Sequence, residues 1–354
     1  MNILYLINHA GNGGSEKYVQ VLCEAVESKG DKAYLAYGEH GALADKRMDT
    51  SYELPMRHPF DVTAVWGLAK LCRELEIDVV HTQFPRENYI ALLCKLFSRR
   101  KLQVVYTAHM HLHAGRIHKL LNWTLTGANA QVIAVCNSVR EMLITQRYPD
   151  NRIQVIYNGV PHEPLPTAPQ EVKFTFVTLA RLSPEKGLSF LLKAARKLKN
   201  RGIDFQLKIA GEGGLRHQLE REIIQQNLTE HVFLLGHVLD TRTLLATSHV
   251  YVNSSEHEAL SFGVLEGMVA GLPVIATHVG GNVDIIRKAE NGLLVAYDDA
   301  DALAEAMADM ITQAETYERY VTNSHQATAT TFNVTQILEQ TYQVYVDVTT
   351  PTQA

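Results

Sequence analysis

The chain has 354 residues, too many for one ordinary hydrophobic core and enough for two domains of roughly 150 to 200 residues each. Hydrophobic residues make up 46% of it, and the formal net charge of −5 excludes the globally basic surface typical of nucleic-acid-binding proteins. The four cysteines are widely spaced and form no CxxC pair, so we expect buried thiols in a reducing compartment rather than a zinc or redox site.

Short apolar runs alternate with amphipathic stretches along the chain, a pattern typical of parallel sheets crossed by helices. The first apolar run is only about six residues long, which fits a buried strand better than a signal peptide. No run approaches the roughly 20 apolar residues of a membrane span. We therefore expect a cytoplasmic protein, peripheral at most at the inner face of the membrane. In this half a helix is predicted over 16–29, and strands are predicted over 2–7, 32–37, 78–81, 102–107 and 130–135.

A polar, proline-rich stretch at 161–169 is interpreted as a linker, because the alternating pattern restarts after it. The expected fold is α/β, with two Rossmann-like, doubly wound domains that face each other across a cleft, at 1–165 and 166–332. Residues 333–354 should form a C-terminal helix that could pack back on the N-terminal domain, and a frayed tail. Beyond the linker a helix is predicted over 186–200, and strands are predicted over 174–179, 205–210, 232–235, 250–253 and 274–276.

Two carboxylates, Glu258 and Glu266, flank a loop that turns into a short helix. Carboxylates accept hydrogen bonds from sugar hydroxyls, and the free backbone N–H groups of a loop or a helix N-terminus suit a diphosphate. We predict a helix over 262–270 that ends at Gly271, with Pro273 beyond it. This segment therefore indicates a site for a sugar attached to a diphosphate.

Arg181 and Lys186 lie in the segment Ala-Arg-Leu-Ser-Pro-Glu-Lys-Gly, with Arg181 after a predicted strand and Lys186 at a predicted helix start. At such positions two cations can converge on one anion, although a charged surface loop would have the same composition. A glycine-rich loop with Gly13 and Gly14 follows the first strand. It is a weak dinucleotide fingerprint, because Glu16 replaces the last glycine, and it could serve only for close strand–helix packing.

Together these motifs resemble the Glu-x7-Glu signature and the Arg-x4-Lys clamp of the retaining family 4 glycosyltransferases, which have the GT-B fold. The resemblance covers nearly the whole chain. It implies transfer of a hexosyl group from a nucleotide-diphosphate sugar to an acceptor hydroxyl, with retention of configuration and with neither a metal nor a cofactor. By resemblance Glu266 binds the ribose, Glu258 lies beside the donor sugar, and Arg181 and Lys186 neutralise the diphosphate.

The resemblance also assigns His109 to a place near the donor sugar. One departure is visible, since the family usually has Gly after its first Glu and this chain has Ala259. The remaining donor-binding positions that the resemblance implies are Gly13, Gly14, Gly211, His237, Val238, Ala259, Leu260, Ser261 and Phe262.

Three histidines, His109, His111 and His113, follow one predicted strand, but no acidic or cysteine residue stands nearby to complete a metal site. His111, Ser138 and Asn158 are assigned to the acceptor side of the cleft by resemblance. The sequence Asp-Ala-Asp at 299–301 has the form of a metal-binding DxD motif. It is better interpreted as acidic residues in the first turn of a helix, where they oppose the helix dipole.

The segment 86–123 is basic and also carries apolar residues, so it is either a solvated helix face or a peripheral membrane contact. The expected partners are a UDP-linked sugar and a carbohydrate or lipid-linked acceptor, in the synthesis of cell-surface polysaccharide or glycoconjugates. Two other functions stay open. One is a nucleotide-sugar epimerase or hydrolase on the same fold, and the other is a sugar-nucleotide-binding module without catalysis.

Overall fold

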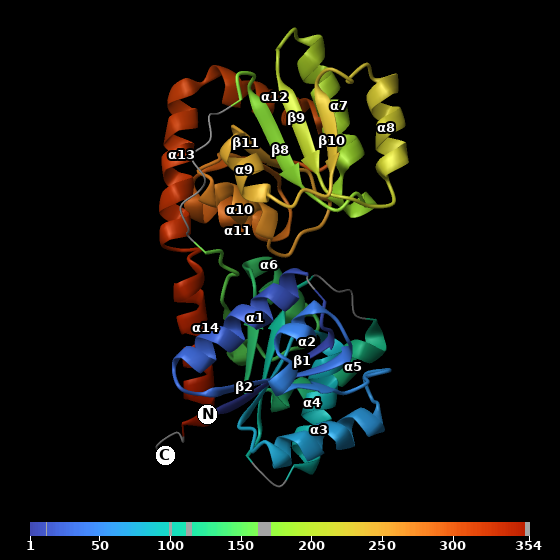
Figure 1. Cartoon of the computed structure of the whole chain (residues 1–354), viewed down its shortest axis with the longest axis vertical. Helices are drawn as coiled ribbons and strands as arrows, with labels where there is room; N and C mark the ends of the chain where they lie inside the picture. The colour runs from blue at the N-terminus through green and yellow to red at the C-terminus, as the bar shows by residue number, and fades with distance from the viewer. Residues whose placement is uncertain (12, 99–100, 111–114, 162–170, 351–354) are drawn as a thin grey trace. The chain divides into compact units, whose positions relative to one another are not determined.

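The computed structural model describes residues 1–11, 13–98, 101–110, 115–161 and 171–350. Two compact units divide the chain: unit 1 comprises residues 1–158 and 337–354, and unit 2 comprises residues 159–336. Each unit is built around its own parallel sheet (Figure 1). The predicted linker at 161–169 and the expected domain boundary at 165–166 fall almost entirely among residues 162–170, outside the described ranges.

The sheet of unit 1 has the strand order β3-β2-β1-β4-β5-β6-β7, and all its strands pair in parallel. Its central strands are buried on both faces, which explains why they form continuous apolar runs in the sequence. The order reverses between β1 and β4, which places the topological switch point there. The strands are β1 (Asn2–His9), β2 (Lys32–Glu39), β3 (Ser51–Glu53), β4 (Val79–Thr82), β5 (Gln103–Ala108), β6 (Gln131–Ala134) and β7 (Ile153–Val155).

Helices cover both faces of this sheet. Apolar side chains of α1 and α14 form one core with it, and those of α3 and α4, joined by Leu125 at the end of α5, form the other. The C-terminal helix α14 is also held by a buried hydrogen bond of 2.6 Å between the Tyr345 hydroxyl and His81 Nδ1. The helices are α1 (Gly14–Ser28), α2 (Ala42–Lys46), α3 (Val62–Glu74), α4 (Pro85–Phe97), α5 (Arg116–Leu125), α6 (Asn137–Thr145) and α14 (Val334–Thr349).

The sheet of unit 2 has the strand order β10-β9-β8-β11-β12-β13 and is also entirely parallel. Its switch point lies between β8 and β11. All five strands predicted in this half are present, and β13 is an additional edge strand. The strands are β8 (Thr175–Leu179), β9 (Gln206–Ala210), β10 (Val232–Gly236), β11 (Val250–Asn253), β12 (Val274–Thr277) and β13 (Gly292–Val295).

The helices of unit 2 form two layers. Side chains of α7, α8 and α12 build one large core with the sheet, while α13 contacts both α10 and α11. The predicted helix before Gly271 is confirmed, and Gly271 has the left-handed backbone (φ 74°) of a helix stop. The helices are α7 (Leu188–Asn200), α8 (Arg216–Gln225), α9 (Thr241–Ala246), α10 (Phe262–Val269), α11 (Gly280–Ala289), α12 (Ala300–Thr312) and α13 (Ala314–Ala329).

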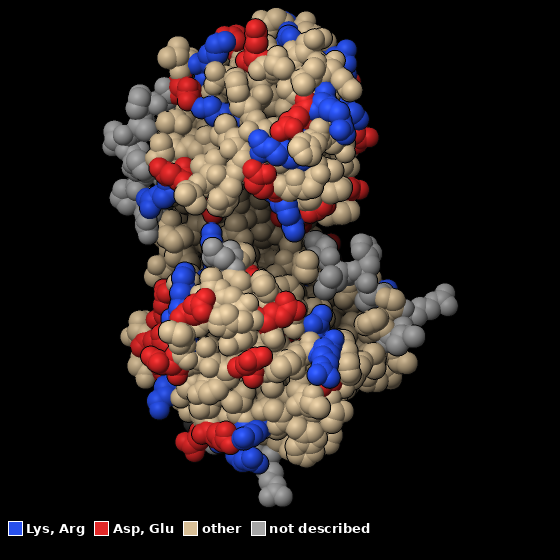
Figure 2. Space-filling model, turned by 45° about the vertical axis from the view of Figure 1, so that its right-hand side comes forward, with Lys and Arg blue, Asp and Glu red and all other residues tan. Residues whose placement is uncertain are grey.

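The predictions for the four cysteines and for the Asp-Ala-Asp sequence are confirmed. The four cysteines are all buried and unbridged, as expected. Asp299 caps α12 by accepting a hydrogen bond of 2.9 Å from the Ala302 N–H, and Asp301 lies in the first turn, so the Asp-Ala-Asp sequence has the predicted helix-start role. On the visible face of both units, acidic and basic side chains are interspersed (Figure 2).

Candidate functional site

The candidate residues of unit 2 all follow the carboxyl ends of its strands. Arg181 follows β8, Gly211 follows β9, His237 and Val238 follow β10, and Glu258 follows β11. In a doubly wound sheet, ligands bind beyond this edge and near the switch point, which here separates β8 from β11. Residues far apart in the sequence are therefore brought to one edge of the sheet by its topology.

An ion pair at this edge joins Lys186 and Glu258. Lys186 Nζ lies 2.8 Å from Glu258 Oε2, and the two side chains are only 22% and 13% exposed. The Ser255 hydroxyl donates a second hydrogen bond, of 3.0 Å, to the same carboxylate oxygen. A carboxylate and an ammonium are thus held together at the edge where the β8 and β11 loops meet.

Lys186 was predicted at the start of a helix, and this prediction is wrong. It ends a 3-10 turn, Pro184–Lys186, and α7 begins only at Leu188. Gly187 between them has φ 62°, and a Cβ there would lie 2.1 Å from the Ser254 carbonyl oxygen. The turn therefore presses the backbone against the β11 loop, and this close approach directs the Lys186 side chain toward Glu258.

Arg181 lies at the end of β8, and its side chain is 73% exposed. Its guanidinium is 3.6 Å from Glu185 Oε1. The Ser183 hydroxyl donates a 2.6 Å hydrogen bond to the same carboxylate and is the main reason that the pKa of Glu185 lies below its usual value. An exposed guanidinium and a largely enclosed ammonium thus lie on one short loop, as an anion clamp requires.

Backbone and buried polar groups fix the β11 loop. The Glu256 N–H donates to the Glu185 carbonyl at 2.8 Å, which ties this loop to the β8 loop. Asn253, at the end of β11, accepts from the Ser255 N–H and from the Asn282 side chain, each at 3.1 Å. Because these groups are buried, the loop that carries Glu258 is held in one conformation.

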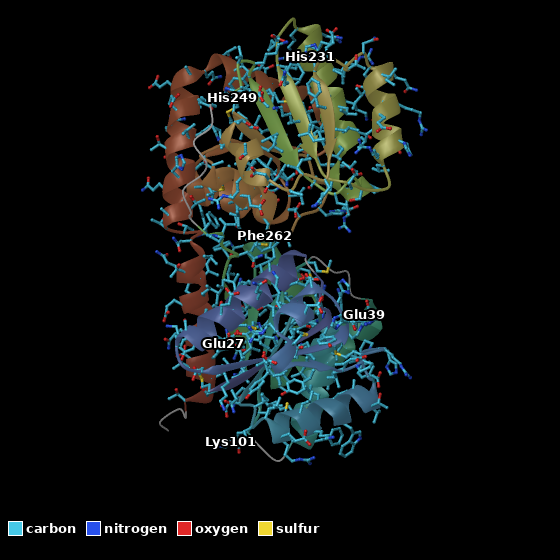
Figure 3. The ribbon with its side chains drawn as sticks, viewed as in Figure 1. Glu27, Glu39, Lys101, His231, His249 and Phe262 are labelled. Atoms are coloured by element: carbon cyan, nitrogen blue, oxygen red, sulfur yellow. The ribbon has the colours of Figure 1, made fainter. Side chains whose placement is uncertain are left out.

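Helix α10 begins directly after this loop, at Phe262 (Figure 3). Ser261 is its N-cap, and its hydroxyl oxygen accepts from the Val264 N–H at 3.4 Å. Leu260 is buried, so only its backbone can face a ligand. Gly281 packs so closely that a Cβ there would lie 1.9 Å from the Ala259 carbonyl oxygen. The first turn of α10 therefore offers backbone N–H groups and positive dipole charge beside Glu258.

Glu266 lies one turn further along α10 and lines a cavity of about 290 Å³. The cavity also contains Thr241 and Arg242 from the first turn of α9, a set that the motif analysis missed. The N-cap signature of Asp240, two residues after Val238, could have indicated a helix start at this place. Its lining residues are Val160, Pro161, Thr241, Arg242, Leu245, Glu266 and Val269.

The positions near β9 and β10 differ in exposure. Gly211 has φ 143°, and a Cβ there would lie 1.9 Å from the Ala180 carbonyl oxygen, so close packing of two loops already requires glycine. His237 is exposed and Val238 is half-buried. These two residues follow the Gly236 turn, next to the loop that leads into α9.

In unit 1 the glycine loop follows β1, at the switch point of that sheet. Gly13 is the N-cap of α1, and Gly14 is its first residue. A Cβ on Gly13 would lie 2.7 Å from Glu16 Oε2, the end of a side chain in the same helix, so this contact does not test the close strand–helix packing considered from the sequence. Both glycines expose backbone at a helix N-terminus, the kind of position that binds anions.

His109 directly follows β5 and is enclosed by the rings of Tyr18 and Phe84. Its Nε2 donates to Gln83 Oε1 at 2.8 Å, which leaves Nδ1 as the acceptor of the ring. Burial lowers the pKa of His109 to about 4, so the imidazole is neutral near pH 7.

The other predicted residues of unit 1 are spread along it. Ser138 is the second residue of α6, and its hydroxyl is 3.1 Å from Cys136 Sγ. Asn158 is buried at the end of the unit. His111 and His113 lie outside the described residues. Among the residues that are described, no three His, Cys, Asp or Glu side chains group as a metal site would require.

Two family models match consecutive parts of the chain. "Glycosyltransferase Family 4" matches residues 12–164, and "Glycosyl transferases group 1" matches residues 165–327. The chain belongs to the family 4 glycosyltransferases. The matches extend over both units. The second match includes Lys186, Glu258 and helix α10, which carries Glu266.

Relatives of this glycosyltransferase agree with the assignment. The chain is 29% identical to EpsD of Bacillus subtilis over 326 residues, 84% of this chain and 85% of EpsD. It is 24% identical to the UDP-Gal:alpha-D-GlcNAc-diphosphoundecaprenol alpha-1,3-galactosyltransferase of Escherichia coli over 310 residues, 81% of this chain and 80% of that enzyme.

The fold also matches solved structures. Anabaena Alr3699/HepE in complex with UDP superposes with a TM-score of 0.87 at 19% identity, covering 98% of this chain and all of that chain. The GT-B fold predicted from the sequence is confirmed. In the described part of the chain, no helix combines the length and the apolar character that crossing a membrane requires.

Proposed function

We propose that this glycosyltransferase moves a hexosyl group from a UDP-linked sugar to a hydroxyl of a carbohydrate or lipid-linked acceptor, with retention of the anomeric configuration and without a metal ion. The Lys186–Glu258 pair beside the first turn of α10 carries the proposal. It sets one cation, one carboxylate and a row of backbone N–H groups at the switch point, a combination that suits a diphosphate joined to a sugar.

In this proposal different residues bind the ribose, the diphosphate and the sugar of the donor. Glu266 accepts hydrogen bonds from the ribose hydroxyls, with the base in the cavity that Thr241 and Arg242 line. Arg181, Lys186 and the N–H groups of α10 hold the diphosphate. Glu258 lies beside the sugar, and His109, neutral and an acceptor at Nδ1, contacts a sugar hydroxyl. The two family models that together cover these residues support the assignment.

The reaction follows from these roles. The bond between the anomeric carbon and the diphosphate oxygen breaks, while the acceptor oxygen bonds to the anomeric carbon from the same face. The acceptor proton passes to a donor phosphate oxygen, so no protein base is needed. Arg181, Lys186 and the α10 dipole stabilise the negative charge that develops on the leaving diphosphate, a contribution that is commonly the largest in such catalysis.

The acceptor and the cellular location belong to the same proposal. The Escherichia coli relative acts on a diphosphoundecaprenol-linked sugar, which supports a lipid-linked acceptor at the cytoplasmic face of a membrane. Peripheral attachment through the region 86–123 would bring the enzyme to such an acceptor. The synthesis of surface polysaccharide or glycolipid is the setting that fits these partners.

The test combines binding with product analysis. UDP-, GDP- and ADP-hexoses are screened by thermal shift, because a ligand at about 100 times its dissociation constant adds about 2.7 kcal/mol to stability. With the best donor and a lipid-linked acceptor, NMR should show an α-linked product from an α-linked donor, also after EDTA treatment. Release of free sugar or an epimerised donor without acceptor would favour a hydrolase or an epimerase, and binding without turnover would favour a non-catalytic module.

A further inference from the structure

Helices α3, α4 and α5 on one side of the unit 1 sheet carry large apolar side chains that face water. Trp66 is 66% exposed, Leu96 63%, Phe97 66%, Leu120 60% and Trp123 70%. We call these five residues the outer helical face. The rings of Trp66 and Phe97 stack with their centroids 6.4 Å apart, so α3 and α4 contribute to one continuous part of it. Single exposed apolar residues are ordinary, but a group of this size on adjacent helices indicates an interaction surface.

These side chains are not needed for the core. Helix α3 already buries Ala64, Val65 and Leu68 against the sheet, and Trp66 lies off that stripe. Helix α4 is buried over most of its length, and Leu96 and Phe97 extend beyond its buried part. The residues of the outer helical face are therefore separate from the residues that each helix buries against the rest of unit 1.

The segment that carries four of these five residues is basic, whereas α3, which carries Trp66, also has Glu74. Between Glu87 and Glu141 the chain has no Asp or Glu but seven Lys or Arg residues, in a protein whose net charge is −5. Lys119 and Arg147 line a surface hollow of about 410 Å³ together with Leu120 and Trp123. Basic groups thus accompany the exposed apolar residues.

Only part of the segment 86–123 is available for the expected membrane contact, because several of its residues are engaged or buried within unit 1. Arg86 donates to the Met56 carbonyl at 3.0 Å, and Lys95 Nζ donates to the Ala128 carbonyl at 2.9 Å, so both are engaged within the unit. Strand β5 in the same segment is buried. Arg99, Arg100 and the side chain of Arg116 are outside the description. The surface that remains is the outer helical face, which includes Trp66 from outside the segment and has Arg147 beside it in the hollow.

We propose that the outer helical face docks on an anionic phospholipid bilayer. Trp66 and Trp123 insert their rings at the level of the headgroups, where indole is favoured because it is apolar with one polar N–H. Leu96, Phe97 and Leu120 reach the acyl boundary, and Lys119 and Arg147 bind lipid phosphates around the hollow. The docking rests on the proposed function only in that a lipid-linked acceptor would be met at such a surface.

Tryptophan fluorescence tests this directly, because Trp66 and Trp123 are the only two tryptophans of the chain. The full-length protein is titrated with phosphatidylcholine vesicles, with and without phosphatidylglycerol. We expect co-sedimentation only with the anionic vesicles, a shift of indole emission to shorter wavelengths, and reversal by salt. The single variants Trp66→Phe and Trp123→Phe each leave one tryptophan. In both variants the emission of the remaining tryptophan should shift on vesicle binding.

Variants assign the interaction to named side chains. Lys119→Ala and Arg147→Ala should each weaken vesicle binding roughly 5-fold, since one cation near an anionic surface contributes about 1 kcal/mol. Leu120→Ser should also weaken it. The matched control is Ile224→Ser on α8 of unit 2, where the side chain is 64% exposed, and vesicle binding should not change.

Several outcomes would overturn the proposal. They are no binding to anionic vesicles at low salt, binding without a change in tryptophan emission, or equal loss in Leu120→Ser and Ile224→Ser. A second copy or a protein partner on this face would also overturn it, seen as concentration-dependent burial of the tryptophans without vesicles. None of these measurements requires catalysis, so a failed docking surface and a failed glycosyltransferase assignment are distinguished.

Discussion

Lys186 Nζ lies 2.8 Å from Glu258 Oε2, although 72 residues separate the two in the sequence. The contact spans the switch point of unit 2, because Lys186 follows β8 and Glu258 follows β11. Glu258 therefore holds the ammonium in place before any diphosphate arrives. An ammonium has three donor hydrogens, so Lys186 can bind phosphate oxygens without leaving Glu258. In the proposed reaction, this pair preorganises the positive charge that stabilises the leaving diphosphate.

Replacement of this cation should reduce turnover more than folding. We expect Lys186→Ala to lower kcat by roughly 100-fold or more, as for the loss of one preorganised electrostatic group. Steady-state kinetics with a radiolabelled donor measures this. Lys193→Ala on α7, where the lysine is 61% exposed, is the matched control and should keep its activity. If Lys186→Ala turned over at the wild-type rate, the anion clamp would be wrong.

Glu266 should determine nucleotide affinity rather than the chemical step. Glu266→Gln keeps the size of the side chain but removes its charge, and charged hydrogen bonds are roughly twice as strong as neutral ones. We expect about a 10-fold weaker affinity for UDP by calorimetry. Glu318→Gln, on the exposed surface of α13, is the control. Unchanged UDP binding in Glu266→Gln would place the ribose elsewhere.

Two glycines offer a comparison of packing. A Cβ on Gly281 would lie 1.9 Å from the Ala259 carbonyl oxygen, whereas a Cβ on Gly214 would have no heavy atom within 4 Å. Gly281→Ala should therefore displace the loop after Glu258, destabilise the protein by about 1–3 kcal/mol, and weaken donor binding. Gly214→Ala should change stability by less than about 0.5 kcal/mol. Thermal unfolding and donor titration check both, and equal behaviour of the two variants would contradict the packing argument.

The sequence was sufficient for the architecture. Buried parallel strands form continuous apolar runs, so ten of the strands could be predicted from those runs alone. The short strands β3 and β7, of three residues each, and β13 at an edge could not. Such segments are too short for a periodic signal, and they become strands only because a neighbour pairs with them.

For the site too, local motifs could be recognised in the sequence, whereas contacts between distant segments could not. Glu258, Glu266, Arg181 and Lys186 are recognisable as motifs because each lies within one short segment. The contact between Lys186 and Glu258 could not be recognised in the sequence, because it depends on the pairing of β8 with β11. The α9 residues that line the Glu266 cavity were also missed. Their position follows from helix packing rather than from any local pattern.

Two buried histidines of unit 1 should make the protein sensitive to mild acid. Burial lowers the pKa of His81 to about 3 and that of His109 to about 4, while both would have values near 6.5 in the unfolded chain. Below about pH 6.5 the unfolded chain binds protons that the folded chain does not. The free energy of unfolding therefore falls as the pH decreases from about 6.5 toward 4, by up to about 1.4 kcal/mol per pH unit for each histidine.

Carboxylates whose pKa is lowered contribute at lower pH, whereas burial raises the pKa of Glu87, which therefore adds stability as the pH falls. The pKa of Asp61 is lowered to about 2, mainly by the Thr63 hydroxyl, so its stabilisation is lost only as the pH falls below about 4. Urea denaturation between about pH 6.5 and pH 4.5 therefore reports on the two histidines, opposed by Glu87, and a comparison with a histidine variant separates the two effects.

His81→Gln separates the histidine contribution. In the folded protein His81 is fully buried and bonded to Tyr345 and to the Thr107 hydroxyl, so we expect lower stability at neutral pH. We also expect a shallower fall with acid, and this slope, unlike the stability itself, does not depend on the lost packing. His217→Gln on the surface of α8, where the histidine is 87% exposed, is the control and should keep the wild-type slope. Parallel stability curves for His81→Gln and the wild type would show that His81 does not remain neutral in the folded state.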